Sequence, residues 1–290
     1  MTRLPGVDLF QVDLGVHQED GGSFSPPALA LQLAGVVIAV HCDSAEWLGL
    51  AATRLGQHGT QAEAEFTVRY HIMPDHWNDL DPGRLKPGLG YVRSDTASGF
   101  EIRSTHFSVR TDLDRREADV FGPMELGPLQ VLLRTLLPAL VTDGIVMHGA
   151  GLADGDRGWV CTGPSGCGKS TMAGLFPDKA LCDELVAVRR LDGRFVVDAL
   201  PFWTSRAATV PLAGIHFLRH GIENRRSELP PPIALQRLTR EIHWPTYARE
   251  AVDSCFAIAT EIVAAAQCWE LAFVPDTSVW SALAGATPSP

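Results

Sequence analysis

A glycine-rich segment in the second half of the 290-residue chain carries residue types that could hold a chain of phosphates. Residues 163–171 read GPSGCGKST and match the pattern G-x-x-x-x-G-K-[ST] in full. Glycines let the backbone curl until successive N–H groups point at phosphate oxygens, and the helix start that follows adds partial positive charge. The pattern predicts a nucleotide-phosphate site formed by Gly163, Pro164, Ser165, Gly166, Cys167, Gly168, Lys169, Ser170 and Thr171.

Two residues of this segment add specific chemistry. Lys169 provides a mobile positive charge that can reach the β- and γ-phosphates, which makes it a candidate catalytic residue. Ser170 offers a hydroxyl to Mg²⁺, an ion that prefers oxygen ligands and bridges phosphates. A strand over residues 159–162 and a helix after the loop are expected, which is the context that the motif requires. ATP and Mg²⁺ are therefore the expected cofactors.

An acidic pair follows the glycine-rich loop after a short stretch of sequence. Asp183 and Glu184 precede an apolar strand expected over residues 185–189, and Pro177 shortens the helix between loop and pair. This tight connection is expected to bring both carboxylates near the γ-phosphate. One carboxylate can hold the metal, and the other can accept a proton from an incoming hydroxyl. A turn with two solvent-exposed acids is the alternative that the residues leave open.

His148 lies between two expected apolar strands, shortly before the loop. A single histidine among apolar residues is usually a core residue, so the residue types alone favour a structural role.

These segments together resemble a known family. The run MHGAGLADGDRGWVCTGPSGCGKST…LCDELVAV is similar to the HPr serine kinases, and more closely to their shorter bacterial relatives, described as HPr kinase-like or phosphoenolpyruvate carboxykinase-like ATPases. The shared features are a His-Gly strand, a hairpin, a phosphate loop and an acidic pair. The similarity is strong over residues 145–190 and weaker over residues 126–284.

The resemblance implies a phosphoenolpyruvate carboxykinase-type P-loop core and transfer of the ATP γ-phosphate to a hydroxyl. It implies that Asp183 is the catalytic base and also a metal ligand beside Ser170. Glu184 stands where HPr kinases usually carry a second aspartate, so it is the further expected metal ligand. His148 matches the family's His-Gly position and is expected to orient or tune the acidic pair.

The chain also departs from that family. It lacks the Glu-x-Arg-Gly signature segment that helps HPr kinases to recognise the HPr protein. The acceptor is therefore left as a serine of a peptide or protein, or a small-molecule hydroxyl. The alternative is an ATP-binding regulatory or accessory module that transfers no phosphate. HPr kinases form oligomers, so a homo-oligomer is possible here.

Hydrophobic periodicity predicts the elements around these residues. Period-2 alternation over residues 64–72 and 99–109, and an apolar run over 33–41, predict strands in the first part of the chain. Leucines spaced by three and four predict an amphipathic helix over residues 126–141. The further expected elements, in chain order, are a short strand over 145–147, a hairpin turn at 191–193, a loop at 230–232 and a helix over 245–267. The expected fold is mixed α/β (α+β), with residues 1–122 forming a β-rich N-terminal region and residues 123–290 an HPr kinase-like P-loop ATP-binding domain.

Composition narrows the remaining function classes. A net charge of −10 argues against a nucleic-acid partner, because phosphate-backbone binding needs clustered Lys and Arg. None of the six cysteines forms a C-x-x-C pair, so a structural zinc site has little support. Without an apolar leader or a run of about 20 apolar residues, no membrane contact is expected and a cytoplasmic location is predicted.

Three minor candidates complete the set. Arg206 could return to the site on a loop and contact the transferred phosphate, although a surface role is the simpler reading. A basic cluster of Arg219, His220, Arg225 and Arg226 could steer an acidic acceptor or be a solvated loop. Cys167 could have a lowered thiol pKa at the helix start, although a small filler residue is the simpler interpretation.

Overall fold

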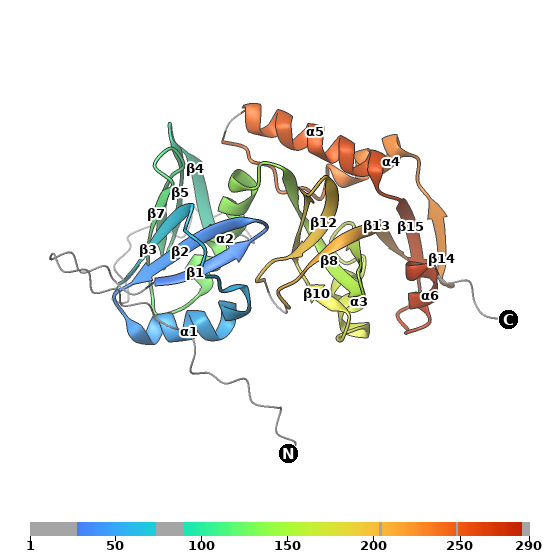
Figure 1. Ribbon diagram of the computed structural model, residues 1–290, viewed down its shortest axis with the longest axis horizontal. Helices are drawn as coiled ribbons and strands as arrows, with labels where there is room; N and C mark the ends of the chain where they lie inside the picture. The colour runs from blue at the N-terminus through green and yellow to red at the C-terminus, as the bar shows by residue number, and fades with distance from the viewer. Residues whose placement is uncertain (1–27, 74–89, 203–204, 248, 286–290) are drawn as a thin grey trace, which may run out of the picture.

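Two mixed β-sheets form the two halves of the protein and lie side by side in the computed structural model (Figure 1). The structure describes residues 28–73, 90–202, 205–247 and 249–285. The seven-stranded sheet has the order β1-β2-β3-β7-β6-β5-β4 and is formed by the first half of the chain. The eight-stranded sheet of the second half has the order β10-β8-β11-β12-β13-β15-β14, with β9 pairing to β13 and β8. The mixed α/β class expected from the sequence is confirmed.

In the first half, the described residues form seven strands, two helices and one short 3₁₀ helix. Their bounds are β1 (Ala28–Leu33), β2 (Val36–Cys42), α1 (Ala45–Leu55), η1 (Gly56–His58), β3 (Phe66–Ile72), β4 (Tyr91–Asp95), β5 (Gly99–Ser104), β6 (Ser108–Asp112), β7 (Glu117–Gly122) and α2 (Gly127–Leu140).

Two runs predicted as single strands are hairpins, so those predictions were wrong. The apolar run over residues 33–41 is broken at Ala34 and Gly35, whose φ angles of 50° and 86° form a tight turn between β1 and β2. The run over residues 99–109 is broken between β5 and β6, which pair antiparallel. The β1–β2 turn consists of Ala34 and Gly35, without a polar residue, whereas the β5–β6 turn contains Thr105 and His106. The hydrophobic pattern alone located neither turn.

Helix α2 confirms the leucine periodicity. Its buried face is formed by residues that are fully or almost fully shielded from solvent, namely Leu129, Leu132, Leu133, Leu136 and Leu137. Pro138 lies within the last turn, and the helix ends two residues later. The buried face packs on the first sheet, and the same core cluster reaches Val146, Leu185 and Phe202 of the second half. The two halves therefore share one hydrophobic core through α2.

The part of the second half that the structure describes forms eight strands and four helices. Their bounds are β8 (Gly144–Asp154), β9 (Arg157–Thr162), α3 (Lys169–Leu175), β10 (Ala180–Cys182), β11 (Leu185–Leu191), β12 (Arg194–Ala199), β13 (Thr209–His220), β14 (Arg225–Glu228), α4 (Pro231–Leu238), α5 (Arg249–Ala265), β15 (Cys268–Phe273) and α6 (Val279–Ala284).

Two long strands connect the pairings of this half into a closed circuit. The first part of β8 pairs with β11 and its second part with β9, while β13 pairs in turn with β12, β9 and β15. Since β11 also pairs with β12, the strands β8, β9, β13, β12 and β11 close on one another. The partner change in β8 occurs at His148 and Gly149, which brings three separate stretches of chain together there.

The prolines at 230–232 begin a helix, although they were expected to mark a loop. Pro230 is the N-cap of α4, and the next two prolines occupy its first turn. Proline suits this position because its fixed φ is helical and its missing N–H would have no partner there. Helix α5 lies inside the expected helical stretch and covers the second half along its upper side in Figure 1.

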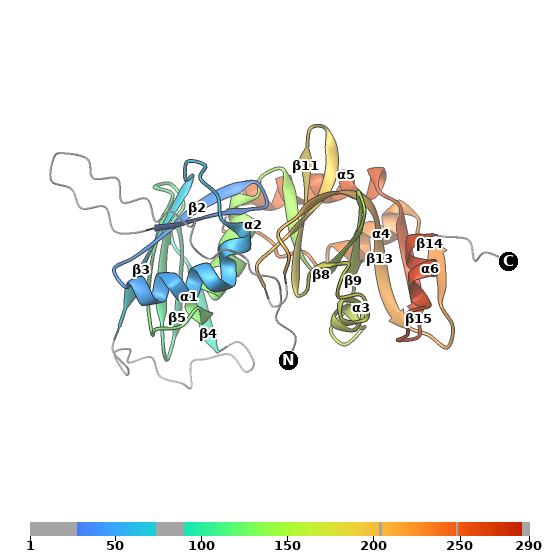
Figure 2. The ribbon, with the colours of Figure 1, turned by 60° about the horizontal axis from the view of Figure 1, so that its bottom comes forward.

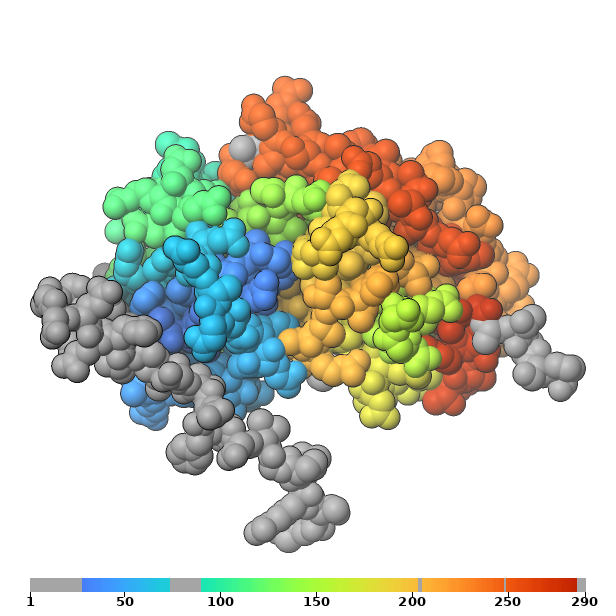
Figure 3. All heavy atoms as spheres, in the orientation of Figure 1, coloured from blue at the N-terminus to red at the C-terminus, as the bar shows by residue number. Residues whose placement is uncertain are grey.

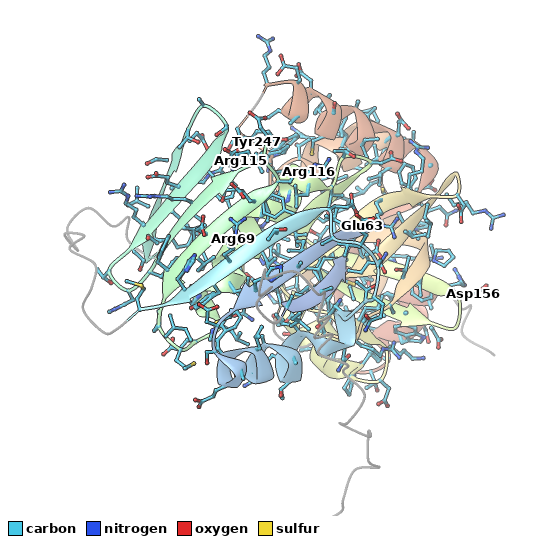
Figure 4. All side chains as sticks on the ribbon, turned by 60° about the vertical axis from the view of Figure 1, so that its left-hand side comes forward. Glu63, Arg69, Arg115, Arg116, Asp156 and Tyr247 are labelled. Atoms are coloured by element: carbon cyan, nitrogen blue, oxygen red, sulfur yellow. The ribbon has the colours of Figure 1, made fainter. Side chains whose placement is uncertain are left out.

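The two halves meet along a broad contact, which Figure 3 shows between the blue and the yellow-orange surfaces. At one point of it the tight turn at Gly35 lies against the Arg189 side chain. At another, His58 of η1 lies 3.4 Å from the Ser205 hydroxyl. Asp156 lies in the β8–β9 turn at the far side from Arg69 of the first sheet (Figure 4).

Candidate functional site

The glycine-rich loop joins the end of β9 to the start of α3, as the motif requires. Gly163, Gly166 and Gly168 have φ angles of 138°, 79° and 105°, a region that only glycine adopts without strain. A Cβ atom on Gly168 would lie 2.4 Å from the Phe273 ring, so the loop also needs glycine there for space. These glycines give the loop the curled path that turns backbone N–H groups toward a bound anion.

Replacing Gly168 by Ala is expected to lower the free energy of unfolding by about 2 kcal/mol or more, because it combines a strained φ with a steric clash. Gly174 is the matched control in α3, since a Cβ there meets nothing within 4 Å. Gly174→Ala is expected to stabilise the protein by about 0.5–1 kcal/mol. Urea unfolding of both variants measures the difference, and equal effects would contradict this reading of the loop.

Lys169 is buried against its own loop. Its ammonium donates to the carbonyl oxygens of Gly163 at 2.7 Å and Pro164 at 3.1 Å, and only 6% of the residue is exposed. A phosphate entering the loop would exchange these carbonyl contacts for phosphate oxygens, which are stronger partners for an ammonium. The hydroxyl-bearing residues Ser170 and Thr171 are exposed beside it, where a metal–phosphate complex can reach them.

His148 and Gly149 lie between the loop and the acidic pair. Thr162, the last residue before the loop, donates its hydroxyl to the His148 carbonyl at 2.6 Å. On the other side of β8, the Gly149 N–H donates to the Glu184 carbonyl at 3.2 Å. Two strand spacings amount to roughly 10 Å, so β8 sets the acidic turn close to the phosphate loop. The long β8 replaces the short strand expected over residues 145–147.

The acidic pair forms a tight, strained turn. Glu184 has a φ of 78°, which is unusual for a residue with a side chain, and its N–H donates to the Asp183 carboxylate at 2.8 Å. The Leu185 N–H donates to the Asp183 carbonyl at 3.1 Å and returns the chain to β11. The Asp183 carboxylate thus accepts one hydrogen bond from the Glu184 N–H, and it forms no ion pair with any residue that the structure describes. It is the freer of the two acids.

The Glu184 carboxylate is shared between two basic side chains. One oxygen accepts from the Arg134 guanidinium of α2 at 2.9 Å, and the other lies 3.5 Å from Nε2 of His148. All three side chains are about one-third exposed. His148 thus contacts the acidic pair, as the resemblance implied, and Arg134 joins a group that the sequence analysis did not include.

His243 lies behind the group formed by the Arg134, His148 and Glu184 side chains. Burial, together with smaller contributions from Arg134 and His148, lowers the pKa of His243 to about 4 against the opposing charge of Glu184. Its backbone N–H donates to the Val146 carbonyl of β8 at 2.9 Å. A neutral imidazole therefore packs behind the ion pairs at neutral pH.

The lowered pKa of His243 predicts a pH-dependent stability. The unfolded chain binds a proton at this histidine below pH 6.5, whereas the folded protein resists it down to about pH 4. The contribution of the neutral His243 to the free energy of unfolding is therefore fully present above pH 6.5. It is lost as the pH falls from 6.5 to about 4, by up to about 1.4 kcal/mol per pH unit. Urea unfolding between pH 7 and pH 4 should show a shallower loss in His243→Gln than in wild type. Parallel curves would contradict the prediction.

A pattern in the sequence could have identified Arg134 as a candidate site residue. It is the sole charged residue in the leucine-rich stretch 126–141. A charge on an otherwise apolar helix that is buried on one face needs a partner, and here the partner is Glu184. No comparable sequence pattern marks His243, because its position behind β8 results from the path of the chain after α4.

The minor candidates are placed as follows. The Arg206 N–H donates to the Leu181 carbonyl at 2.7 Å, so its loop does return beside β10, and its side chain is exposed. Arg219 forms an ion pair with Glu270, and Arg226 stacks on Trp269, so these two members of the basic cluster are engaged. His220 contacts the Gly166 carbonyl at 2.9 Å. Burial raises the pKa of the Cys167 thiol despite nearby Lys169, which opposes a reactive thiolate.

Comparison of the chain with protein-family models and with curated proteins gave no match. No helix in the described part of the chain is long and apolar enough to cross a membrane. Within that same part, no three His, Cys, Asp or Glu side chains group together in a way that could hold a metal ion.

Proposed function

We propose that the protein is a Mg-ATP-dependent kinase that transfers the γ-phosphate of ATP to a hydroxyl of a peptide, a protein or a small molecule. The observation that supports this most directly is the partner change in β8. It sets the acidic turn at Asp183 beside a complete phosphate-binding loop, with His148 between them. A phosphate donor site and a free carboxylate are the two parts that transfer to a hydroxyl requires.

The donor side of the reaction belongs to the loop residues. Backbone N–H groups of residues 163–168 and the Lys169 ammonium hold the phosphate chain and spread its negative charge. The residue types suit Mg²⁺, because Ser170 and the acidic pair offer oxygen ligands. The ion, when bound, neutralises charge on the phosphate oxygens.

The acceptor side belongs to the acidic turn. Asp183 accepts the proton of the attacking hydroxyl, because its carboxylate has no competing ion pair among the described residues. Arg134 and His148 hold the neighbouring Glu184 carboxylate in place, and the bond to the Glu184 N–H orients Asp183 itself. Whether Glu184 also contacts the metal stays a prediction, since both of its oxygens already have partners.

The second candidate function is an ATP-binding regulatory module without phosphate transfer. Two contacts favour it: Arg134 and His148 occupy the Glu184 carboxylate, and the Lys169 ammonium is bonded to its own loop. A module of this kind would open the loop on binding ATP and signal through the change in shape.

Conversion of ATP to ADP, measured with and without Mg²⁺ and with bound nucleotide quantified in the same samples, separates the two. Kinases transfer phosphate slowly to water when the acceptor is absent. Slow Mg-dependent turnover therefore supports the kinase. Stoichiometric binding of ATP with no turnover supports the regulatory module, and no binding of ATP rejects both.

A further inference from the structure

A pocket with a volume of about 710 Å³ lies beside the acidic turn, between the two halves of the protein. Its walls come from the last turns of α1, the first part of α2, Tyr91 of β4 and the Pro201–Phe202 segment. Helices α1 and α2 lie near each other in Figure 2, and the pocket occupies the space where their side chains face. The volume lies within the range of pockets that hold small ligands or short peptide segments.

One wall of the pocket is apolar and open to solvent. Leu50 of α1 and Met124, just before α2, are 39% and 40% exposed, which is unusual for side chains of this kind. Val131 and the buried Phe202 continue the apolar surface inward. An apolar surface that leads from solvent into a pocket is suited to an apolar portion of a ligand.

Three polar side chains of the pocket have no partner in the part of the chain that the structure describes. Arg54, Tyr91 and Gln130 line it, and their side chains form no hydrogen bond or ion pair within the described residues. Arg54 is a free cation at the last turn of α1, where it is exposed. The exposed Glu125 also lines the pocket and can accept from an N–H group. The free guanidinium favours a carboxylate on the occupant.

Arg134 connects the pocket to the acidic turn. Its side chain lines the pocket and at the same time donates to the Glu184 carboxylate at 2.9 Å. Its guanidinium lies 5.6 Å from the centre of the Phe202 ring, which anchors it at the pocket's inner end. Arg134 therefore links the pocket to Glu184, the neighbour of the carboxylate that is proposed to accept the hydroxyl proton.

We propose that this pocket is the acceptor site and that the acceptor is an amphipathic hydroxy acid. The proposal rests on the kinase function. The apolar portion packs on Leu50 and Met124, the carboxylate pairs with Arg54, and the hydroxyl reaches past Arg134. The hydroxyl oxygen forms a bond to the γ-phosphorus while the bond from that phosphorus to the β–γ bridging oxygen breaks. Asp183 takes the hydroxyl proton, and ADP leaves.

The shared chemistry can come from two sources. A serine flanked by apolar and acidic residues in a peptide presents a hydroxyl, an apolar portion and a carboxylate. A small hydroxy acid with an alkyl chain presents the same three groups. The experiment below therefore includes one compound of each kind.

Dansyl-L-serine is the probe, because it combines a fluorescent apolar group, a hydroxyl and a carboxylate, and dansyl-L-serinamide lacks only the carboxylate charge. We expect Arg54→Gln to weaken binding of dansyl-L-serine about tenfold and to leave the amide within twofold. Arg240→Gln is the matched control, since Arg240 is likewise exposed and forms no ion pair among the described residues. Loss of affinity for both compounds to the same extent in Arg54→Gln, or in the control, would overturn the carboxylate assignment.

The apolar wall is tested in the same titration. Leu50→Gln is expected to weaken both probes about fivefold, whereas Ile233→Gln should not, although Ile233 is similarly exposed at 42% on α4. Displacement of the probe by Mg-ATP would overturn the proposal, because it would place the probe in the nucleotide site. Stronger displacement by acetyl-Leu-Ser-Leu-Asp-amide supports a peptide source, stronger displacement by 3-hydroxydecanoate a small acid, and displacement by neither overturns the site.

These measurements need no turnover. A chain that binds the probe in this pocket yet never converts ATP to ADP would reject the kinase proposal and with it the role of the pocket as an acceptor site. A chain that turns over ATP but binds the probe equally in pocket and control variants would retain the kinase function and reject the pocket alone.

Discussion

Asp183→Asn is expected to reduce Mg-dependent conversion of ATP to ADP by about 100-fold or more, while the dissociation constant of ATP changes less than threefold. Removal of a positioned general base typically costs this much. The amide keeps the oxygen that accepts from the Glu184 N–H, so the strained turn should persist. Steady-state turnover and calorimetric titration with Mg-ATP measure the two quantities.

Asp178→Asn is the matched control for this substitution. Asp178 is exposed in the turn between α3 and β10, and its carboxylate forms no ion pair among the described residues. The control variant should retain wild-type turnover. Full turnover in Asp183→Asn would remove Asp183 from the mechanism and leave Glu184 as the remaining acid of the turn. If Asp183→Asn also lost thermal stability, its lower turnover would instead result from a change in the fold.

Lys169→Met is expected to weaken Mg-ATP binding about 100-fold, which corresponds to about 2.7 kcal/mol. The side chain is enclosed by its own loop, so its ammonium meets the phosphates in a site largely removed from water, where a charge contact is strong. The two carbonyl contacts that Lys169 gives up on binding offset part of this gain. Methionine keeps the apolar length of the side chain and removes the charge.

Lys179→Met provides the comparison, because Lys179 loses an ion pair with Asp154 at 2.6 Å and a cation–π contact with Trp280, and neither partner belongs to the glycine-rich loop. Its ATP affinity should match wild type. If Lys169→Met binds Mg-ATP as tightly as wild type, the loop is not the phosphate site, and the proposed function fails at its first step. If Lys169→Met binds Mg-ATP weakly and its urea-unfolding midpoint also falls, the loss of affinity reflects an unfolded loop.

Local residue patterns predicted the elements whose formation depends on neighbours in sequence. The leucine spacing located α2, and the turn at residues 191–193 located the β11–β12 hairpin, where Asp192 and Gly193 have φ angles of 48° and 76°. Motif context located the strand before the phosphate loop and the short helix after it. The patterns failed at the turns of the β1–β2 and β5–β6 hairpins, because neither the apolar run over residues 33–41 nor the alternation over residues 99–109 marks where the chain turns.

The sequence by itself determined the phosphate loop, because glycines at 163, 166 and 168 are required by the backbone path they take, and the position of Asp183 soon after it along the chain. Only the tertiary structure decided what surrounds these residues. Arg134 reaches Glu184 from a helix of the first half of the chain, and the pocket at Arg54 forms where α1, α2, β4 and the Pro201–Phe202 segment meet. The physical reason is that such contacts depend on strand pairings and buried packing between distant segments, which local propensity does not encode.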